Sequence, residues 1–171
     1  PAPAVKESRD AYTTPVTLLQ DGKPQVVVLG GDCVTGYDPE TGTELWRGLG
    51  LNPRNSEKNR IIVSPVAVDG MVYVCASHEP FLAIRGGGSG DITATHVAWR
   101  WEGNGPDVPT PACDGTYVYF VDDRGVILCF NAKDGTTLWG PERTGKGAVS
   151  ASPVVADGKV YKLAGPETWH F

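Results

Sequence analysis

Short runs of β-branched and aromatic residues alternate with turn residues along the whole chain. An Asp-Gly pair stands shortly before each of four such runs, at residues 25–29, 71–75, 117–121 and 159–163. An Asp-Gly pair between two apolar runs is a strong β-hairpin signal, because glycine accepts the positive φ that tight turns need. The pattern therefore predicts many short antiparallel strands joined by tight turns.

The pattern repeats. A Ser-Pro or Thr-Pro pair opens each of four copies, with the prolines 50, 46 and 42 residues apart, at Thr14-Pro15, Ser64-Pro65, Thr110-Pro111 and Ser152-Pro153. The second half of the repeat is clearest in the first and third copies, where residues 36–46 align with residues 129–139. Each half predicts two strands, so one repeat is a unit of four short antiparallel strands.

The unit can be placed along the chain. We expect strands at about 16–19, 25–29, 34–37 and 44–47 in the first copy, and at about 108–112, 117–121, 126–130 and 137–139 in the third. In the second copy the third strand, 81–85, runs into a glycine-rich insertion at 86–91 before a fourth strand at 95–101. The fourth copy stops after two strands.

Repeated four-stranded units of this length are typical of β-propeller blades. We therefore expect an all-β protein, a partial β-propeller of about three and a half four-stranded antiparallel blades. The domain covers 12–163, with blades at about 12–48, 62–102 and 107–140, an incomplete blade at 149–163, and tails at 1–11 and 164–171.

Composition and net charge limit the classes of partner that the chain can be expected to bind. Apolar residues make up 40% of the chain and charged residues 20%, which is typical of a globular protein, and the net charge of −5 offers no basic footprint for nucleic acid. No apolar run approaches the roughly 18 residues of a membrane span. The chain opens Pro-Ala-Pro-Ala and its one methionine is Met71, so we expect a processed chain or an excerpt, which leaves export undecided.

The repeat also has a characteristic amino-acid sequence. Residues 152–161 read Ser-Pro-Val-Val-Ala-Asp-Gly-Lys-Val-Tyr, and residues 36–46 read Gly-Tyr-Asp-Pro-Glu-Thr-Gly-Thr-Glu-Leu-Trp. Together they resemble the two halves of the pyrroloquinoline-quinone-like (PQQ-like) repeat, over about residues 12–163. Gly36 replaces the usual alanine, and the third copy departs further at Cys129, Asn131 and Asp134.

Two families share this repeat, the quinoprotein dehydrogenases and the BamB-like propellers. Residues 81–99 are similar to a stretch in large BamB-like proteins of environmental bacteria, which favours the second family. That resemblance implies an exported, non-enzymatic scaffold for protein–protein interaction that needs no cofactor. Two alternatives stay open: a fragment of a PQQ-dependent quinoprotein dehydrogenase, which would use PQQ and calcium, and a carbohydrate- or peptide-binding propeller.

The last residue of the motif has a structural role in any propeller. A large flat side chain on the outer strand can fill the wedge between two blades, and we expect this of Trp46 and Trp139. Trp99 or Trp101 should do the same in the irregular second copy. Sets of turn residues support the motif: Asp38 accepts backbone N–H bonds, and Gly42 and Gly135 take conformations that a β-carbon resists.

An incomplete ring leaves sheet edges and blade faces uncovered. We therefore expect a protein partner or a second copy of the chain to complete the propeller, giving seven or eight blades in the case of two copies.

The sequence contains only weak candidates for a metal-binding, phosphate-binding or catalytic site. The acidic clusters Asp122-Asp123-Arg124-Gly125 and Asp32-Cys33 could hold a metal ion, but the first is better explained as a hairpin turn. The glycine-rich stretch 86–91 lacks a following Gly-Lys-Ser/Thr, so a flexible insertion is favoured over a phosphate loop. The hydroxyl residues Thr14, Ser64, Thr110 and Ser152 recur at one repeat position and belong to the blade.

Histidines and cysteines add no metal motif. His78, His96 and His170 show no spacing typical of a metal site. Cys33, Cys75, Cys113 and Cys129 lie in or beside apolar runs with no C-x-x-C pair, which favours buried thiols, although a disulfide stays open in an exported protein.

Overall fold

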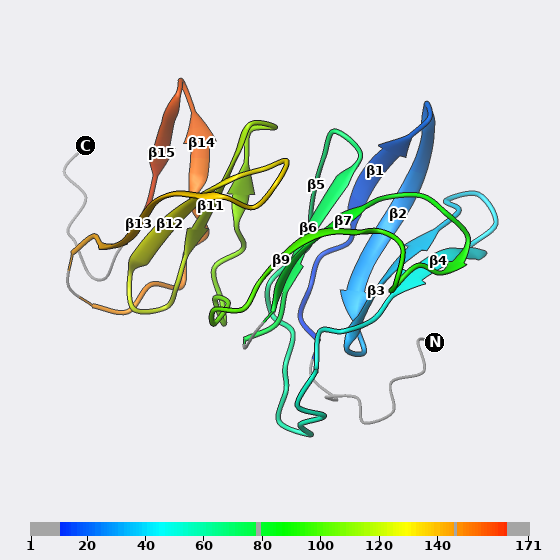
Figure 1. The fold of residues 1–171 in the computed structure, drawn as a ribbon, viewed down its shortest axis with the longest axis horizontal. Helices are drawn as coiled ribbons and strands as arrows, with labels where there is room; N and C mark the ends of the chain where they lie inside the picture. The colour runs from blue at the N-terminus through cyan, green and yellow to red at the C-terminus, as the bar shows by residue number, and fades with distance from the viewer. Residues whose placement is uncertain (1–10, 78–79, 146, 164–171) are drawn as a thin grey trace.

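Four β-sheets stand side by side in chain order in the computed structural model of the protein (Figure 1). The structure describes residues 11–77, 80–145 and 147–163. Fifteen strands and no helix occur in these residues. The first and last sheets lie at opposite ends of the row. The expected all-β class, with four-stranded antiparallel sheets arranged as blades, is confirmed.

The strands follow the repeat closely. The first sheet contains β1 (Val16–Gln20), β2 (Lys23–Gly30), β3 (Cys33–Tyr37) and β4 (Glu44–Gly48). The second contains β5 (Val66–Val68), β6 (Met71–Cys75), β7 (Phe81–Arg85) and β9 (Val97–Trp101). The third contains β10 (Ala112–Cys113), β11 (Tyr117–Val121), β12 (Val126–Asn131) and β13 (Thr137–Arg143), and the fourth β14 (Val154–Ala156) and β15 (Lys159–Tyr161).

The Asp-Gly pairs form the first hairpin turn of each sheet. Asp21, Asp69 and Asp157 have φ values of 51°, 50° and 50°, and each is followed by a glycine that also has positive φ. In the third sheet only the glycine, Gly115, takes this conformation, with φ of 91°. Two consecutive left-handed residues match the right-handed twist of the flanking strands, which is why these turns close tight hairpins.

The core lies between the sheets. One apolar cluster joins the first and second sheets, and a second, with several aromatic rings, joins the second and third. In the second cluster the rings of Phe81 and Trp99 are 5.5 Å apart, and those of Trp101 and Phe120 are 5.4 Å apart. Burial of such side chains is the main stabilising term in this arrangement.

Two local expectations were wrong. The strand expected at 108–112 is reduced to β10, because Pro109 and Pro111 have no N–H to donate to a neighbouring strand. The insertion in the second copy is not a free loop. Its strand β8 (Gly90–Asp91) pairs in parallel with β4 and extends the first sheet to five strands.

No helix in the described ranges is long and apolar enough to cross a membrane.

Candidate interaction surfaces

The recurring Ser/Thr residues link one sheet to the next. The backbone N–H of Thr14 donates to Ser64 Oγ at 2.9 Å, the N–H of Ser64 to Thr110 Oγ1 at 3.1 Å, and the N–H of Thr110 to Ser152 Oγ at 3.0 Å. Each hydroxyl thus satisfies the backbone of the preceding repeat. The hydroxyl residues at this one repeat position therefore form a series of hydrogen bonds that links all four repeats.

The ladder register identifies equivalent tryptophans. In each four-stranded sheet one tryptophan of the last strand stands opposite a small residue, in the pairs Trp46 with Gly36, Trp99 with Ala83 and Trp139 with Cys129. A register shift accompanies each pair, directly after the small residue. Trp99, and not Trp101, is therefore the equivalent residue in the second copy. Trp101 packs instead against Phe120 and Phe130.

Trp99 shows how the motif joins two sheets. Its Nε1–H donates to the carbonyl of Ala132 in the third sheet at 2.9 Å, and the hydroxyl of Tyr73 donates to the same oxygen at 3.0 Å. The ring lies on Gly135, where a built Cβ would come within 2.6 Å of it. The second sheet thus holds the last turn of the third sheet by two hydrogen bonds and one ring contact.

Trp46 is also buried between sheets, but with different partners. It is fully buried in the cluster that includes Ile92, the residue directly after the insertion, and its Nε1–H donates to Gln25 Oε1 at 2.8 Å. Its backbone pairs with Gly90 of β8. The insertion therefore covers the outer strand of the first sheet.

Trp139 lies in a different environment. Its side chain is 42% exposed, although it occupies the same ladder position as the other two. The neighbouring fourth sheet consists of only β14 and β15 in the described residues, so it has no outer strands to cover the indole. The docking role of Trp139 stays a prediction.

The motif turn of the first sheet is held by Asp38. Its Oδ1 accepts the N–H groups of Thr41 at 2.8 Å and Glu40 at 2.9 Å, and these bonds, the one from Thr41 first, lower the pKa of Asp38 from its ordinary 3.8. Gly42 in this turn has φ of 68°, and Gly135 in the third sheet has φ of 74°. No atom lies within 4 Å of a Cβ built at Gly42.

The carboxylates of the candidate metal ligands Asp122 and Asp123 already accept hydrogen bonds from other groups of the protein. Asp122 accepts the N–H groups of Arg124 and Val126 on one oxygen and the Arg124 guanidinium on the other. Asp123 accepts the backbone N–H groups of Asp107 at 2.7 Å and Val108 at 3.2 Å. Both carboxylates therefore serve the turn and the connection between the second and third sheets.

Asp32 is engaged in the same way. Its two oxygens accept the side-chain amides of Asn52 and Asn59, each at 2.8 Å, and Asn59 is buried. This network holds the long loop between the first two sheets. A calcium ion needs oxygen ligands that face an open centre, and no group of three His, Cys, Asp or Glu residues is placed for a metal within the described ranges. The acidic candidates do not fit the calcium of a quinoprotein.

We expected a flexible insertion at residues 86–91, and this was wrong, because the insertion packs against the first two sheets. The N–H of Gly86 donates to the carbonyl of Gly70 at 2.8 Å, and a Cβ at Gly86 would lie 2.3 Å from Leu18. The His96 ring lies against Gly88, and its Nδ1 is 2.8 Å from Thr95 Oγ1. The other two histidines, at 78 and 170, lie outside the described residues.

None of the four cysteines, all of which lie within the described residues, forms a disulfide. Cys33, Cys75 and Cys129 are buried and Cys113 is half-buried. Burial raises the pKa of Cys75, Cys113 and Cys129. A thiol with a raised pKa stays protonated at neutral pH and is a poor nucleophile.

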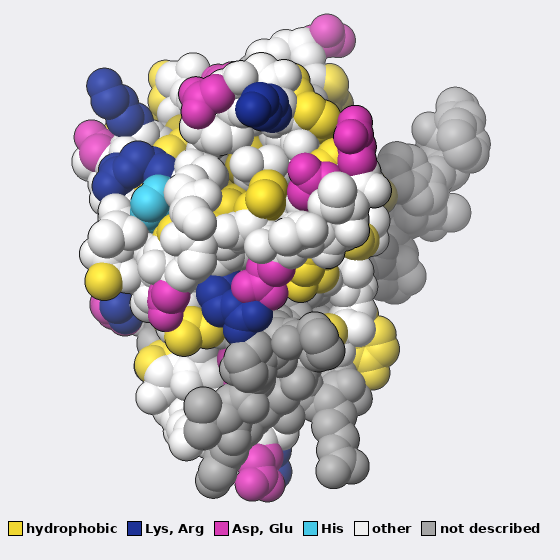
Figure 2. Space-filling model, turned by 90° about the vertical axis from the view of Figure 1, so that its right-hand side faces the viewer, with side chains coloured by type: hydrophobic (Ala, Val, Ile, Leu, Met, Phe, Trp, Pro, Cys, Tyr) yellow, Lys and Arg dark blue, Asp and Glu magenta, His cyan; other side chains and the backbone are white. Residues whose placement is uncertain are grey.

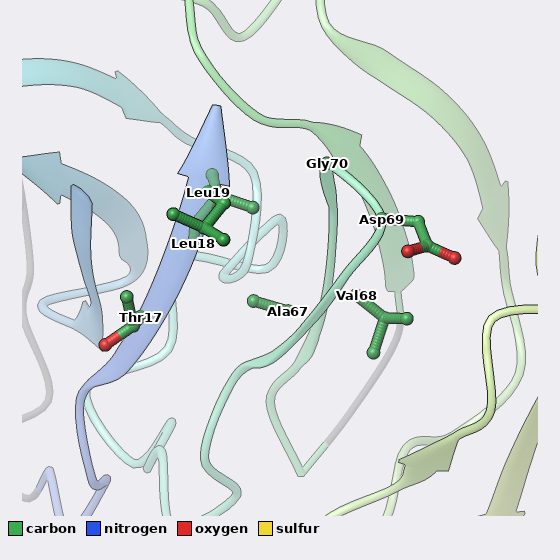
Figure 3. Close-up of a pocket in the computed structure, with 7 residues that line it drawn as sticks. All are labelled: Thr17, Leu18, Leu19, Ala67, Val68, Asp69 and Gly70. Atoms are coloured by element: carbon green, nitrogen blue, oxygen red, sulfur yellow. The ribbon is translucent and has the colours of Figure 1, made fainter. Parts of the chain in front are cut away.

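A shallow groove of about 370 Å³ lies between the first strands of the first two sheets (Figure 3). Polar and apolar atoms both line the groove, and Leu19 at its rim is 66% exposed. The carboxylate of Asp69 points away from β1, toward Gly115 of the third sheet. The groove is lined by Thr17, Leu18, Leu19, Ala67, Val68, Asp69 and Gly70. It offers apolar contact to a ligand or partner.

The outer side of the first sheet has mixed charge. Figure 2 shows Lys, Arg, Asp and Glu side chains interspersed over this side, with scattered apolar side chains between them. Neither charge forms a continuous patch there, in keeping with the modest net charge of −5.

Sequence reasoning missed the contacts that depend on tertiary structure. The bond of Asp123 to the backbone at 107 and 108 and the ion pair between Arg60 and Asp107 join segments that are far apart in the chain. No spacing in the sequence signals either of them. The groove of Figure 3 likewise forms only when the first two sheets stand side by side.

The repeated sheets and the tryptophan contacts agree with a comparison to known families. A family model described as outer membrane protein assembly factor BamB matches residues 4–140 and, in a second overlapping match, residues 89–168. The chain belongs to the BamB family. The resemblance to PQQ-like, BamB-like propellers is therefore confirmed.

Individual BamB proteins and solved structures show how similar this chain is to them in sequence and in fold. BamB of Yersinia pestis is 26% identical over 147 residues, which cover 80% of this chain and 35% of that protein. The chain thus spans about a third of the length of this relative. The computationally designed Ika4 protein has a similar fold, with a TM-score of 0.64 and 15% identity over 91% of this chain and 88% of that chain. BamB of Moraxella catarrhalis aligns over 94% of this chain and 59% of its own, with 16% identity and a TM-score of 0.46.

Proposed function

We propose that this member of the BamB family is an exported, non-enzymatic scaffold that binds other proteins during outer membrane protein assembly. The proposal takes the process from the name of the relative from Yersinia pestis. One observation carries the scaffold role. Among the described residues, six of the exposed large apolar side chains lie on the strands of the last two sheets or directly after them, at Tyr117, Leu138, Trp139, Val154, Tyr161 and Leu163. Exposed large apolar side chains that concentrate in one part of a protein commonly mark protein interaction sites.

The repeated residues support this proposal. The hydroxyls of Ser64, Thr110 and Ser152 hold neighbouring sheets together, and Asp122 and Asp123 are engaged by backbone donors. These residues serve structure, whereas the exposed apolar side chains are available to a partner. We further propose that residues 12–163 are one partial propeller, which a protein partner or a second copy of the chain completes.

Photo-crosslinking in cells tests the scaffold role. The chain is exported to the periplasm of a Gram-negative host with a photoreactive amino acid at Leu138, or at the solvent-exposed Arg54 as a control. We expect Leu138 adducts that contain components of the outer membrane assembly machinery, and few such adducts from position 54. Equal adducts from both positions would contradict the proposal.

The quinoprotein alternative has its own assay. The purified chain is mixed with PQQ and calcium, and absorbance and dye-coupled alcohol oxidation are recorded. We expect no turnover. Clear turnover would replace the scaffold proposal by an enzyme.

A further inference from the structure

A pocket of about 360 Å³ lies between the second and third sheets, beside the outer strands β9 and β13. We call it the Trp101 pocket. Its volume falls within the range of about 300–1,000 Å³ that is usual for small-molecule sites. Its apolar lining includes Trp101, Phe120 and Leu128, and its polar lining includes Asn104, Arg124 and Thr137.

The second and third sheets form this pocket without help from the fourth. Phe120 and Leu128 face the second sheet, where they belong to the aromatic cluster. Side chains alternate between the two faces of a strand, and the neighbouring residues Val121 and Ile127 pack on the other side, with Val160 of β15. The part of the chain that follows the third sheet therefore lies on the side away from the pocket.

The corresponding space between the first and second sheets is filled by the chain itself. Two residues after its motif tryptophan the first sheet has Gly48, and the second sheet has Trp101. Ile92, directly after the insertion, lies 3.8 Å from a Cβ built at Gly48 and is only 2% exposed. In the third sheet β12 and β13 are joined by the short turn 132–136 without an insertion. The space beside Trp101 therefore stays open within the described residues.

The rim of the Trp101 pocket carries polar groups with unused hydrogen-bonding capacity. Nε and Nη2 of Arg124 donate to Asp122 Oδ2 at 2.9 and 2.7 Å, so the carboxylate holds the guanidinium in place and balances its charge. The Arg124 side chain is 73% exposed, and its Nη1 makes no hydrogen bond within the described ranges. The same holds there for the exposed side chains of Asn104 and Thr137.

These walls select a neutral ligand with one apolar end. Phe120 and Leu128 are 1% and 6% exposed and offer no polar partner, so a hydroxyl placed against them would lose its water without replacement. Amide and hydroxyl groups at the rim both donate and accept, which matches the hydroxyls of a sugar. The half-buried indole of Trp101 adds a flat apolar surface for the C–H groups of a sugar ring.

We propose that the Trp101 pocket binds an N-acetylated amino sugar. The acetyl methyl group points toward Phe120 and Leu128, and the amide and hydroxyl groups of the sugar bind Arg124 and Asn104 at the rim. This gives the carbohydrate-binding alternative one specific site. The site is separate from the scaffold role, so failure of the cellular crosslinking would leave sugar binding intact, and the reverse also holds.

Isothermal titration calorimetry of the full 171-residue chain tests the proposal. The probe is N,N′-diacetylchitobiose, and cellobiose is the matched sugar, because it has the same two linked rings with hydroxyls in place of the acetamido groups. We expect saturable binding of N,N′-diacetylchitobiose. Cellobiose should bind about fourfold more weakly or worse, since it has no methyl group to bury on the apolar wall.

Two variants assign the binding to the rim. Arg124→Ala should weaken binding about tenfold or more, and Asn104→Ala about twofold to tenfold, as for hydrogen bonds to a charged and to a neutral group. Arg85→Ala is the matched control, because Arg85 is exposed at the end of β7 opposite to Phe81, the residue that pairs with Trp101. Thermal midpoints are measured first. If Arg124→Ala disturbs its turn, the exposed Asn104 still decides.

Four results would overturn the proposal. The first is the absence of saturable binding up to about 10 mM sugar. The second is equal affinity for the two disaccharides, and the third is unchanged affinity in both rim variants. The fourth is binding of N-acetyl-leucine amide as tight as that of N,N′-diacetylchitobiose, because the occupant would then be a peptide side chain.

Discussion

The indole of Trp99 rests on Gly135 of the neighbouring sheet, so close that a β-carbon there would lie 2.6 Å from the ring. Gly135 also has φ of 74°, which disfavours any other residue. Two independent requirements thus meet at one glycine. Gly42 provides a natural comparison, because it occupies the same motif position with φ of 68° and has no atom within 4 Å of its built Cβ.

Gly135→Ala should therefore destabilise the protein more than Gly42→Ala. The left-handed conformation costs about 1–2 kcal/mol for either alanine, and overpacking against Trp99 costs a further 1–3 kcal/mol, roughly, at position 135 alone. Urea unfolding measures both free energies. Equal losses in the two variants would show that the Trp99 contact does not constrain Gly135.

Ser64→Ala should weaken the contact between the first two sheets. The change removes the hydroxyl that accepts the Thr14 N–H, and a hydrogen bond of this kind contributes about 0.5–1.5 kcal/mol. Ser64→Thr should be nearly neutral, because threonine stands at this repeat position in the first and third copies. The free energy of unfolding is again the measurement, and a loss of the same size in Ser64→Thr would rule out the hydroxyl as the cause.

Asp123→Ala should destabilise the connection between the second and third sheets. It leaves the N–H groups of Asp107 and Val108 without their carboxylate acceptor, a loss of about 1.5–3 kcal/mol. Arg124→Ala is the neighbouring control, since the Arg124 side chain is 73% exposed and pairs only within its turn.

Calcium tests the same residue for a metal role. Because Asp123 is already engaged by two backbone donors, calcium should leave the thermal midpoint of the unchanged chain where it is. A rise in the midpoint with calcium that disappears in Asp123→Ala would instead support a metal site.

Asp38→Asn should reduce the loss of stability in acid. The bonds from the N–H groups of Thr41 and Glu40 lower the pKa of Asp38 below 3.8, so the folded state binds a proton less readily than the unfolded state does. The stabilisation is present above pH 3.8 and is lost as the pH falls through the lower folded-state pKa. The thermal midpoints of the unchanged chain and of Asp38→Asn are measured between about pH 2.5 and 7, a range that brackets these pKa values.

Asparagine makes Asp38→Asn a conservative change. Asn131 occupies the same position in the third sheet, and its Oδ1 accepts the Lys133 N–H at 2.9 Å. The variant should therefore fold normally at pH 7. An unchanged acid dependence in Asp38→Asn would show that the Asp38 carboxylate does not contribute to it.

Much of the fold follows from local patterns in the sequence. The Asp-Gly pairs, the Ser/Thr-Pro pairs and the two tryptophan motifs place most strands within one or two residues of where they lie, because each pattern reflects a turn or a backbone requirement inside one repeat. The same repeat position for Ser64 and Thr110 indicates a shared structural role. It does not indicate that their hydroxyls bond to the preceding repeat.

Contacts between repeats were decided by the tertiary structure. The register of β7 and β9 selects Trp99 over Trp101, and the parallel pairing of β8 with β4 turns the insertion into a fifth strand. Asp123 becomes a link because the third sheet brings it to the N–H groups of residues 107 and 108. The sequence alone determined an all-β chain of repeated four-stranded units of the PQQ-like class. Only the packing of sheet on sheet decided that Trp46 and Trp99 are buried and that Trp139 is exposed, because burial depends on whether a neighbouring sheet has outer strands to cover the indole.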